Sequence, residues 1–272
     1  MYKEALERGG VAVVTGAASG VGRVAAERFA AAGLTVVLAD LEGDALSQAT
    51  ADISGAIAMP TDVSDAAAVA RLAERAFEIG EIAVLMNNAG VGLSSHSWDN
   101  ADNWRTMIEI NLFGVLHGVQ AFLPRMVSAA RPAVVINTGS KQGITTPPGN
   151  PGYNVSKAGI KAATEALAHD LRQAEVPISA HLFVPGFTYT GMIASRIPEK
   201  PDAAWTSEET IDYLLEKVSA GDFYVLCPDN SVTPELDAKR VAWAAGDIIE
   251  NRPALSRWHP NWADAYKAHE NS

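Results

Sequence analysis

Tyr153 and Lys157 have the residue types and the spacing for acid–base chemistry. Residues four apart on a helix share one face, so a helical segment here would place the phenol beside the ammonium. A free phenol has a pKa of about 10, and an ammonium about 5 Å away would stabilise the phenolate by roughly 3 kcal/mol at an effective dielectric constant of 20. The pair is therefore a candidate general acid/base acting on a hydroxyl or carbonyl group.

A glycine-rich segment follows the first apolar run of the chain and precedes a helical stretch. It reads Thr15-Gly16-Ala17-Ala18-Ser19-Gly20-Val21-Gly22. Glycines at such a turn let the backbone approach a pyrophosphate, and the free N–H groups of the new helix face that anion. A glycine cluster alone also fits an ordinary turn. Its position between a strand and a helix predicts a dinucleotide site.

Asp40 closes the second apolar run. A carboxylate at this position accepts hydrogen bonds from an adenosine ribose and repels a 2′-phosphate. Neither Ser19 nor Leu41 supplies a positive charge that would attract that phosphate. These residues favour NAD over NADP, and the alternative interpretation of Asp40 is a solvated aspartate in a turn.

The elements that must position these residues follow one another regularly. We expect strands at 11–14, 35–39, 56–59, 82–86, 133–136, 178–184 and 223–226. We expect helices at 19–32, 44–53, 64–79, 101–126, 153–173 and 233–250. Short β-branched runs without alternation suit strands covered on both faces, and helical crossovers imply a parallel sheet. The predicted fold class is therefore α/β, a doubly wound parallel sheet in a single domain over residues 1–272, with helices on both faces.

These motifs, in this order, resemble the short-chain dehydrogenase/reductase family in its single-domain form. The resemblance covers about residues 10 to 192 and comprises the glycine loop, Asp62-Val63, Asn87-Asn88-Ala89-Gly90, Asn111, Ser140, Tyr153 with Lys157, and Pro185-Gly186 with Thr190. It implies a Rossmann-type domain and an NAD-dependent oxidoreductase that transfers a hydride between a secondary alcohol or ketone and nicotinamide.

The resemblance also implies roles for individual residues. Tyr153 would exchange the proton with the substrate, and Lys157 would lower the tyrosine pKa and hold the nicotinamide ribose. Ser140 would hydrogen-bond the substrate oxygen, and Asn111 would hold a water that links Lys157 to solvent. The implied cofactor site comprises Gly16, Ser19, Gly20, Val21, Gly22, Asp40, Leu41, Asp62, Val63, Asn88, Ala89, Gly90, Tyr153, Lys157, Pro185, Gly186, Thr188 and Thr190.

Residues 187–210 correspond to the substrate loop of the family, and 229–272 form a C-terminal extension longer than in many relatives. Thr233 and Pro234 have the residue types that begin a helix. Such a helix would group Val241, Ala245 and Ile248 or Ile249 on one face, either packed on the subunit or forming a subunit contact or a pocket wall. The residues expected to line a substrate pocket are His96, Trp98, Gln142, Ile144, Phe187, Tyr189 and Trp205, and their rings favour an aromatic or bulky hydrophobic substrate.

Composition narrows the partners. The net charge of −11 disfavours nucleic acid and anionic membranes. One cysteine and a charged N-terminal segment favour the cytoplasm, and the scattered histidines predict no metal site. By resemblance we expect a small-molecule substrate and a homodimer or homotetramer formed through the helices at 101–126 and 153–173. The alternatives are a dehydratase or epimerase that retains NAD, and an NAD-binding regulator without turnover.

Overall fold

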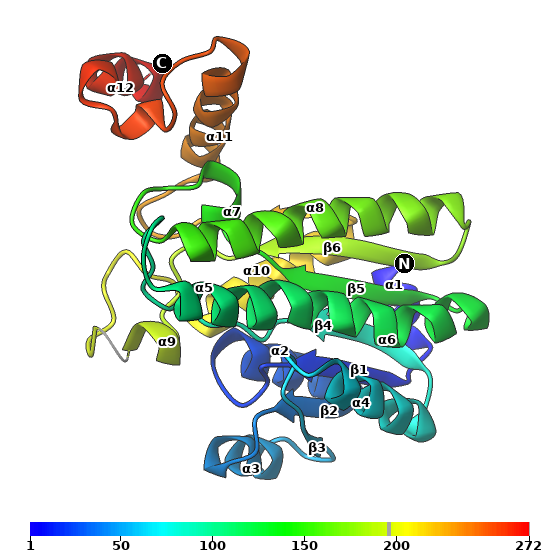
Figure 1. The fold of residues 1–272 in the computed structure, drawn as a ribbon. Helices are drawn as coiled ribbons and strands as arrows, with labels where there is room; N and C mark the ends of the chain where they lie inside the picture. Colours follow the sequence, from blue (N-terminus) through cyan, green and yellow to red (C-terminus); the bar gives the residue numbers. More distant parts are fainter. Residues whose placement is uncertain (195–196, 272) are drawn as a thin grey trace.

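In a computed structural model, which describes residues 1–194 and 197–271, seven strands form one parallel sheet (Figure 1). The spatial order is β3-β2-β1-β4-β5-β6-β7, and the expected doubly wound α/β fold is confirmed. The strands are β1 (Val11–Thr15), β2 (Thr35–Asp40), β3 (Ile57–Pro60), β4 (Ile82–Asn87), β5 (Ala133–Thr138), β6 (Ile178–Val184) and β7 (Tyr224–Leu226).

The strand order reverses between β1 and β4. The chain runs outward from β1 through β2 to β3, and then returns to pair β4 with the other side of β1. The loops that follow β1 and β4 therefore leave the sheet in opposite directions. In an open α/β sheet this divergence opens a crevice at the carboxyl ends of the strands, where ligands bind.

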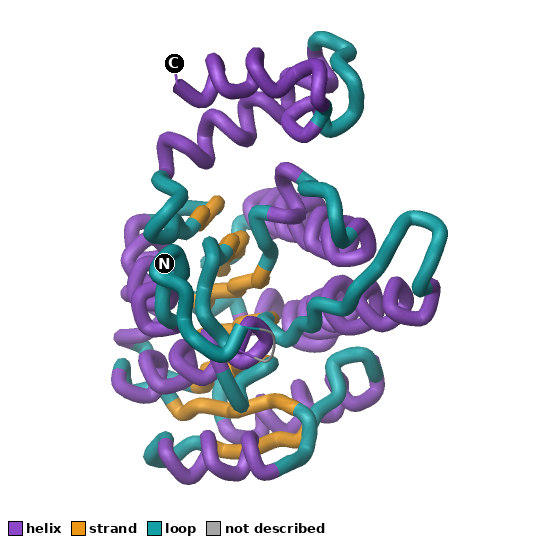
Figure 2. The backbone as a smooth tube through the Cα atoms, turned by 90° about the vertical axis from the view of Figure 1, so that its left-hand side faces the viewer, coloured by secondary structure: helices purple, strands orange, loops and turns teal. Residues whose placement is uncertain are grey.

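Helices cover both faces of the sheet (Figures 1 and 2). One face buries Phe29 and Leu214 under α1 (Tyr2–Glu7), α2 (Gly20–Ala31), α3 (Asp44–Asp52) and α10 (Ser207–Ala220). The other face buries Phe77 and Phe122 under α4 (Ala66–Ile79), α6 (Gly114–Ala129) and α8 (Pro151–Gln173). All six predicted helices are present, whereas α1 and α10 are not among the predicted helices.

A local signal explains why α10 forms. The Thr206 hydroxyl accepts the Glu209 N–H at 3.2 Å, and the Glu209 carboxylate accepts the Thr206 N–H at 2.8 Å. This capping box satisfies two donors at the helix start. The expected substrate loop at 187–210 therefore ends in a helix, and it also contains the single turn α9 (Gly191–Ala194). Its residues 195 and 196 lie outside the described part of the chain.

α5 (Ala101–Met107), the π-helix η1 (Ile108–Phe113) and α6 form one continuous helical stretch. Within the described residues, only this stretch, Ala101–Ala129, is long and apolar enough by length and composition to cross a membrane. Met107, Phe122, Leu123 and Met126 are buried in the body of the protein. A core helix passes the same test of length and composition, so this property is weak evidence for a membrane span.

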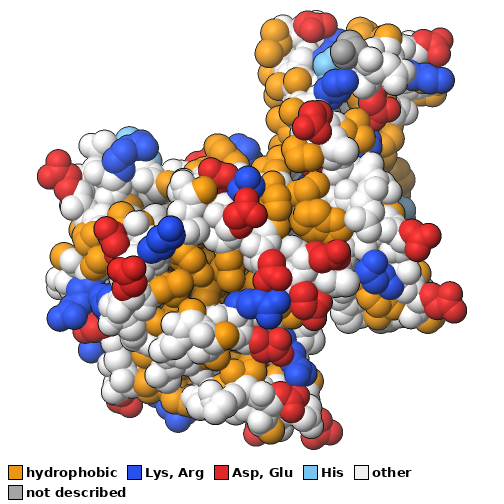
Figure 3. Space-filling model, turned by 180° about the vertical axis from the view of Figure 1, so that it is seen from behind, with side chains coloured by type: hydrophobic (Ala, Val, Ile, Leu, Met, Phe, Trp, Pro, Cys, Tyr) orange, Lys and Arg blue, Asp and Glu red, His pale blue; other side chains and the backbone are white. Residues whose placement is uncertain are grey.

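The last forty residues form a small helical unit that stands off the body beyond α7 (Gln142–Thr145) (Figures 1 and 2). This C-terminal unit, residues 234–271, comprises α11 (Pro234–Ile249), the short 3-10 helices η2 (Ser256–Trp258) and η3 (Pro260–Trp262), and α12 (Ala263–Asn271). Seen from behind, hydrophobic side chains gather where the unit joins the body (Figure 3).

The predicted start of α11 is confirmed, because the Thr233 hydroxyl caps the helix by accepting the Leu236 N–H at 3.3 Å. Ile248 and Ile249 are 85% and 81% exposed, so the expected face does not pack on the body of the subunit, and its role as a subunit contact stays a prediction. The helix instead buries Trp243, because the guanidinium of Arg252 folds back to 4.1 Å from the tryptophan ring.

Candidate active site

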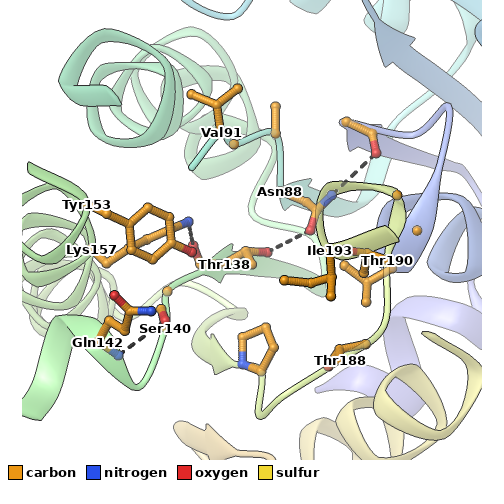
Figure 4. A pocket seen from close by; sticks show the side chains of 18 of the residues that line it. Asn88, Val91, Thr138, Ser140, Gln142, Tyr153, Lys157, Thr188, Thr190 and Ile193 are labelled. Atoms are coloured by element: carbon orange, nitrogen blue, oxygen red, sulfur yellow. Dashed lines mark hydrogen bonds between the residues drawn. The ribbon is translucent and has the colours of Figure 1, made fainter. Parts of the chain in front are cut away.

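A cavity of about 590 Å³ opens at the carboxyl ends of the strands (Figure 4). Its wall comes from the β1–α2 turn, from the segments that follow β2, β4, β5 and β6, and from α8 and α11. The cavity therefore occupies the crevice that the reversal of strand order creates.

Tyr153 and Lys157 project from one face of α8 into this cavity (Figure 4). The helix begins just before them: Asn150 caps it by accepting the Tyr153 N–H at 3.4 Å, and Pro151 occupies the first turn. The Lys157 ammonium donates to the Thr138 carbonyl oxygen at 2.9 Å and lies 5.7 Å from the centre of the Tyr153 ring. The Tyr153 hydroxyl shares a hydrogen bond with the hydroxyl of Ser140, which follows β5.

Burial controls the protonation of both groups. Burial raises the pKa of the Tyr153 phenol, and the hydrogen bond with Ser140 lowers it by a smaller amount. Burial also lowers the pKa of the Lys157 ammonium to about 8. Tyr153 is thus a protonated phenol at neutral pH in the chain alone. Such a phenol is suited to donate a proton to a carbonyl oxygen.

Asn111 lies beneath the cavity, fully buried in the π-helix η1. Its amide donates to the Val91 carbonyl oxygen at 3.0 Å and to the Ser156 hydroxyl at 3.1 Å, and its carbonyl accepts the Val91 N–H at 2.7 Å. A Cβ added to Gly90 would lie 3.1 Å from the Asn111 Oδ1 and 3.6 Å from the Lys157 Nζ. Asn111 and Lys157 therefore face the same small space, and the water-holding role of Asn111 stays a prediction.

The glycine loop shapes the opposite end of the cavity. Gly16 and Gly20 have φ values of +65° and +56°, a backbone conformation that strongly favours glycine. Gly20 and Val21 bring the first turn of α2 into the cavity wall. Gly22 instead lies behind the loop, where a Cβ would come within 2.2 Å of the Gly16 carbonyl oxygen. Gly22 thus permits the close packing that holds the loop in place.

The Asp40 carboxylate lies beside this loop at the end of β2. Its oxygens accept the Ala18 N–H at 2.9 Å and the Leu41 N–H at 2.8 Å, which fixes the carboxylate at the cavity wall. Each carboxylate oxygen can accept a second hydrogen bond, so Asp40 retains the capacity to bind a diol. A glycine loop, a helix N-terminus and a fixed acid together fit a dinucleotide.

The predicted cofactor residues converge on this cavity, with Gly22 behind it. The wall includes Gly16, Ser19, Gly20, Val21, Asp40, Leu41, Asp62, Val63, Asn88, Ala89, Gly90, Tyr153, Lys157, Pro185, Gly186, Thr188 and Thr190. Among the described residues, no group of three or more His, Cys, Asp or Glu is arranged to hold a metal ion.

Among the predicted substrate residues, Gln142 and Phe187 line the cavity. The other predicted rings lie elsewhere. Trp205 packs edge-on against Tyr213 and donates its indole N–H to Asn230 at 3.0 Å. The remaining side chains lie away from the cavity wall. His96 and Trp98 are exposed, Ile144 packs against the β6 core, and the Tyr189 hydroxyl donates to the Pro198 carbonyl oxygen.

The structure also places residues in the wall that the sequence did not indicate: Lys141, Ile193, Asp229, Val232 and Arg240. Lys141 directly follows Ser140, so its proximity to the site was a usable signal. Arg240 comes from α11, far along the chain from any motif, and only the three-dimensional arrangement brings it to the cavity.

Comparison with known proteins settles the family. A family profile described as short chain dehydrogenase matches residues 10–201. The chain belongs to the short-chain dehydrogenase/reductase family. The C-terminal unit lies beyond the residues that match the profile.

Two relatives and one solved structure are informative. The chain is 33% identical to the 1-deoxy-11-beta-hydroxypentalenate dehydrogenase of Streptomyces exfoliatus over 79% of this chain and 81% of the relative. It is 32% identical to a 2-dehydro-3-deoxy-L-rhamnonate dehydrogenase (NAD(+)) of Sphingomonas, over 78% and 82%. A short-chain dehydrogenase/reductase from Burkholderia phymatum, solved in complex with NAD, superposes with a TM-score of 0.81 at 32% identity, covering 90% of this chain and 95% of that one. Membership and these relatives identify an oxidoreductase fold built to bind a nucleotide cofactor.

Proposed function

We propose that the protein is an NAD-dependent oxidoreductase that transfers a hydride between a secondary alcohol or ketone and nicotinamide, with Tyr153 as general acid/base. The observation that carries this proposal is that one cavity holds acid–base side chains at one end and a dinucleotide-binding motif at the other. Tyr153, Ser140 and Lys157 lie together at one end, and Asp40 lies beside the glycine loop at the other. The Asp40 carboxylate, the NAD named for the Sphingomonas relative and the NAD held by the Burkholderia structure support NAD over NADP.

The residues present fit the cofactor. Bound NAD would supply the hydride acceptor for alcohol oxidation, and its reduced form would supply the hydride donor for ketone reduction. Asp40 would accept hydrogen bonds from the adenosine ribose, and the first turn of α2 would donate N–H groups to the pyrophosphate. The Lys157 ammonium has three donors and gives one to Thr138, which leaves two for a ribose.

The chain's own groups then handle the proton. Tyr153 holds its proton at neutral pH because burial raises its pKa, so it can donate to a ketone oxygen. In the reverse direction the phenolate accepts the alcohol proton. Ser140 hydrogen-bonds the Tyr153 hydroxyl and can orient a substrate oxygen toward it. Lys157 keeps a positive charge 5.7 Å from the ring below a pH of about 8, and this charge favours the phenolate.

The substrate class we propose is a small molecule with a hydroxyl or keto group. Both relatives are dehydrogenases whose names include the anion of an organic acid. Phe187 is the aromatic residue of the predicted set that lines the cavity, so support for an aromatic substrate rests on one ring. A homo-oligomer and a cytoplasmic location are also proposed, on the family resemblance and on composition.

The test is turnover with a panel of secondary alcohols and ketones, following the absorbance of reduced nicotinamide. We expect Tyr153→Phe to lower kcat/KM by about 10²- to 10⁴-fold, the range for loss of a general acid/base, and to leave the Kd for NADH within about threefold. Tyr224→Phe is the matched control because that tyrosine lies on β7 and is half exposed. Retained turnover in Tyr153→Phe would falsify the assignment.

The same assay separates the alternatives. An NAD-retaining dehydratase or epimerase would convert its substrate without net formation of NADH. A regulator would bind NADH, detected by fluorescence, and show no turnover with any panel member. The presence of both Tyr153 and Lys157 in the cavity favours turnover.

A further inference from the structure

Arg240 brings a positive charge from the C-terminal unit to the wall of the active-site cavity. It lies on α11, which meets the body next to α7, and α7 directly follows Ser140 and Lys141 in the chain (Figure 1). The neighbouring wall residues at this end are Lys141, Gln142, Asp229 and Val232. Arg240 is thus on the substrate side of the cavity, away from the β2 end where Asp40 lies.

A buried ion pair fixes this position. The Lys141 ammonium lies 2.5 Å from the Asp237 carboxylate, and the two side chains are only 20% and 8% exposed. Asp237 stands three residues before Arg240, so the two share one face of α11. The ion pair therefore holds the face that carries Arg240 against the loop that carries Ser140.

The charged side chains in this part of the wall differ in how completely ion-pair and hydrogen-bond partners balance them. Asp237 neutralises Lys141, and Asp229 accepts backbone N–H groups from Phe187, Ser231 and Val232 while lying 3.8 Å from Lys141.

Arg240, in contrast, has Glu270 as its ion-pair partner at 3.8 Å, beyond hydrogen-bond distance, and shares a hydrogen bond with the Tyr266 hydroxyl. Its Nε is shielded from solvent, and among the described residues it has no hydrogen-bond partner.

We propose that Arg240 binds a carboxylate of the substrate, so that the enzyme acts on hydroxy acids or keto acids whose anion lies toward α11 while the C–O group lies at Tyr153. A guanidinium in a partly dehydrated wall pairs with a carboxylate through two parallel hydrogen bonds. The assignment rests on the alcohol–ketone chemistry proposed at Tyr153, and it adds the charge of the substrate and the residue that recognises it.

The experiment measures binding, so it does not depend on turnover. Acetoacetate, levulinate and a cyclohexanone carboxylate, each beside its methyl ester, are titrated by calorimetry into the full-length protein saturated with NAD, where a ketone cannot react. We expect at least one acid to bind about tenfold or more tightly than its ester, the selectivity of a charge-assisted hydrogen bond. Arg240→Met should abolish that preference, and Arg240→Lys should keep part of it.

Arg257→Met is the matched control. It removes a positive charge from the same unit, but the Arg257 guanidinium lies against Trp258 and Tyr266 at 4.8 and 5.1 Å from the ring centres. This variant should keep the full preference for the acid. Equal or undetectable binding of acid and ester across all pairs, or a preference that persists in Arg240→Met, overturns the proposal. NAD titrated alone tests the proposed cofactor separately; if it does not bind, the acid and ester titrations on the NAD-free protein still decide the role of Arg240.

Discussion

The two ends of the cavity are built in different ways. At the cofactor end, the glycine loop directly follows β1 and Asp40 ends β2. All residues of β1 and the central residues of β2 are buried. At the substrate end, Lys141 comes from the segment after β5, whereas Asp229 and Arg240 come from the part of the chain after β7. The ion pairs of Lys141 with Asp229 and Asp237 join these two parts.

This difference corresponds to two tasks: binding a cofactor that relatives share, and binding a substrate that differs between relatives. Backbone geometry at the end of a packed strand can move little, so it suits a constant ligand such as a dinucleotide. Side chains on loops and on an appended helix can change without disturbing the sheet, so they suit a ligand that differs between relatives. We therefore expect variants at one end to leave the other end nearly unchanged.

Asp40→Asn is the sharpest probe of the cofactor end. It removes the charge and keeps the shape, so the repulsion of a 2′-phosphate is lost. We expect the ratio of kcat/KM for NAD over NADP to fall by about 30-fold, or about 2 kcal/mol. The preference for acids over esters should not change. Asp44→Asn, in the first turn of α3, is the control. An unchanged cofactor ratio, or a wild-type preference for NADP, would contradict the role of Asp40.

Lys157 lies where the two ends meet, and its burial has an energetic cost. Because its pKa falls from 10.5 to about 8 on folding, the ammonium is less favourable in the folded state than in the unfolded one. We expect Lys157→Met to abolish turnover and to raise the free energy of unfolding by about 1 to 3 kcal/mol at pH 7, measured by urea titration.

The pH dependence of this gain has a definite sign. The unfolded wild-type chain binds the Lys157 proton more tightly, so the wild type gains stability as the pH rises from about 8 to 10.5. The advantage of Lys157→Met should shrink across that window. Lys161→Met, whose lysine pairs with Glu165 on the exposed side of α8, should show neither effect. A Lys157→Met variant less stable than the wild type at pH 7 would refute the burial argument.

Asp237→Asn tests the substrate end with the smallest expected effect. It leaves Lys141 with only the more distant Asp229, at 3.8 Å, and should cost about 1 kcal/mol, because Lys141 retains some solvent. We expect faster limited proteolysis between β7 and α11, a higher KM for the substrate and an unchanged Kd for NADH. Asp264→Asn in α12 is the control. Equal proteolysis rates in variant and wild type would show that the ion pair does not hold the unit.

The sequence predicts the cofactor end of the cavity better than the substrate end. The seven strands and the residues around Asp40 and Tyr153 were predictable because each signal is local, a buried run followed by a turn. The capping box of α10 is also a local signal, although the resemblance places this segment in the substrate loop. The burial of Trp243 was not predictable, since it depends on Arg252, which returns to the helix only in the folded unit.

The residues at the substrate end were the hardest to predict, because their positions depend on contacts between distant parts of the chain. Trp205 and Tyr189 were expected in the cavity because of their residue types, yet backbone carbonyls and polar side chains elsewhere engage their polar groups. Arg240 carries no motif, and its position follows from the Lys141–Asp237 ion pair in another part of the chain. A pairing between two distant charges leaves no periodic trace in one sequence.

Because the C-terminal unit stands apart from the body, it can be exchanged in evolution without changing the sheet. All seven strands precede Val232, and the unit after it is held to the body through α7 and the Lys141–Asp237 ion pair. A single recombination event at this junction would exchange a piece of the substrate wall, including the charge at Arg240, while every strand and the whole nucleotide end are inherited intact. On the proposed role of Arg240, an exchange of these helices would change which substrates are bound and would leave the sheet unchanged.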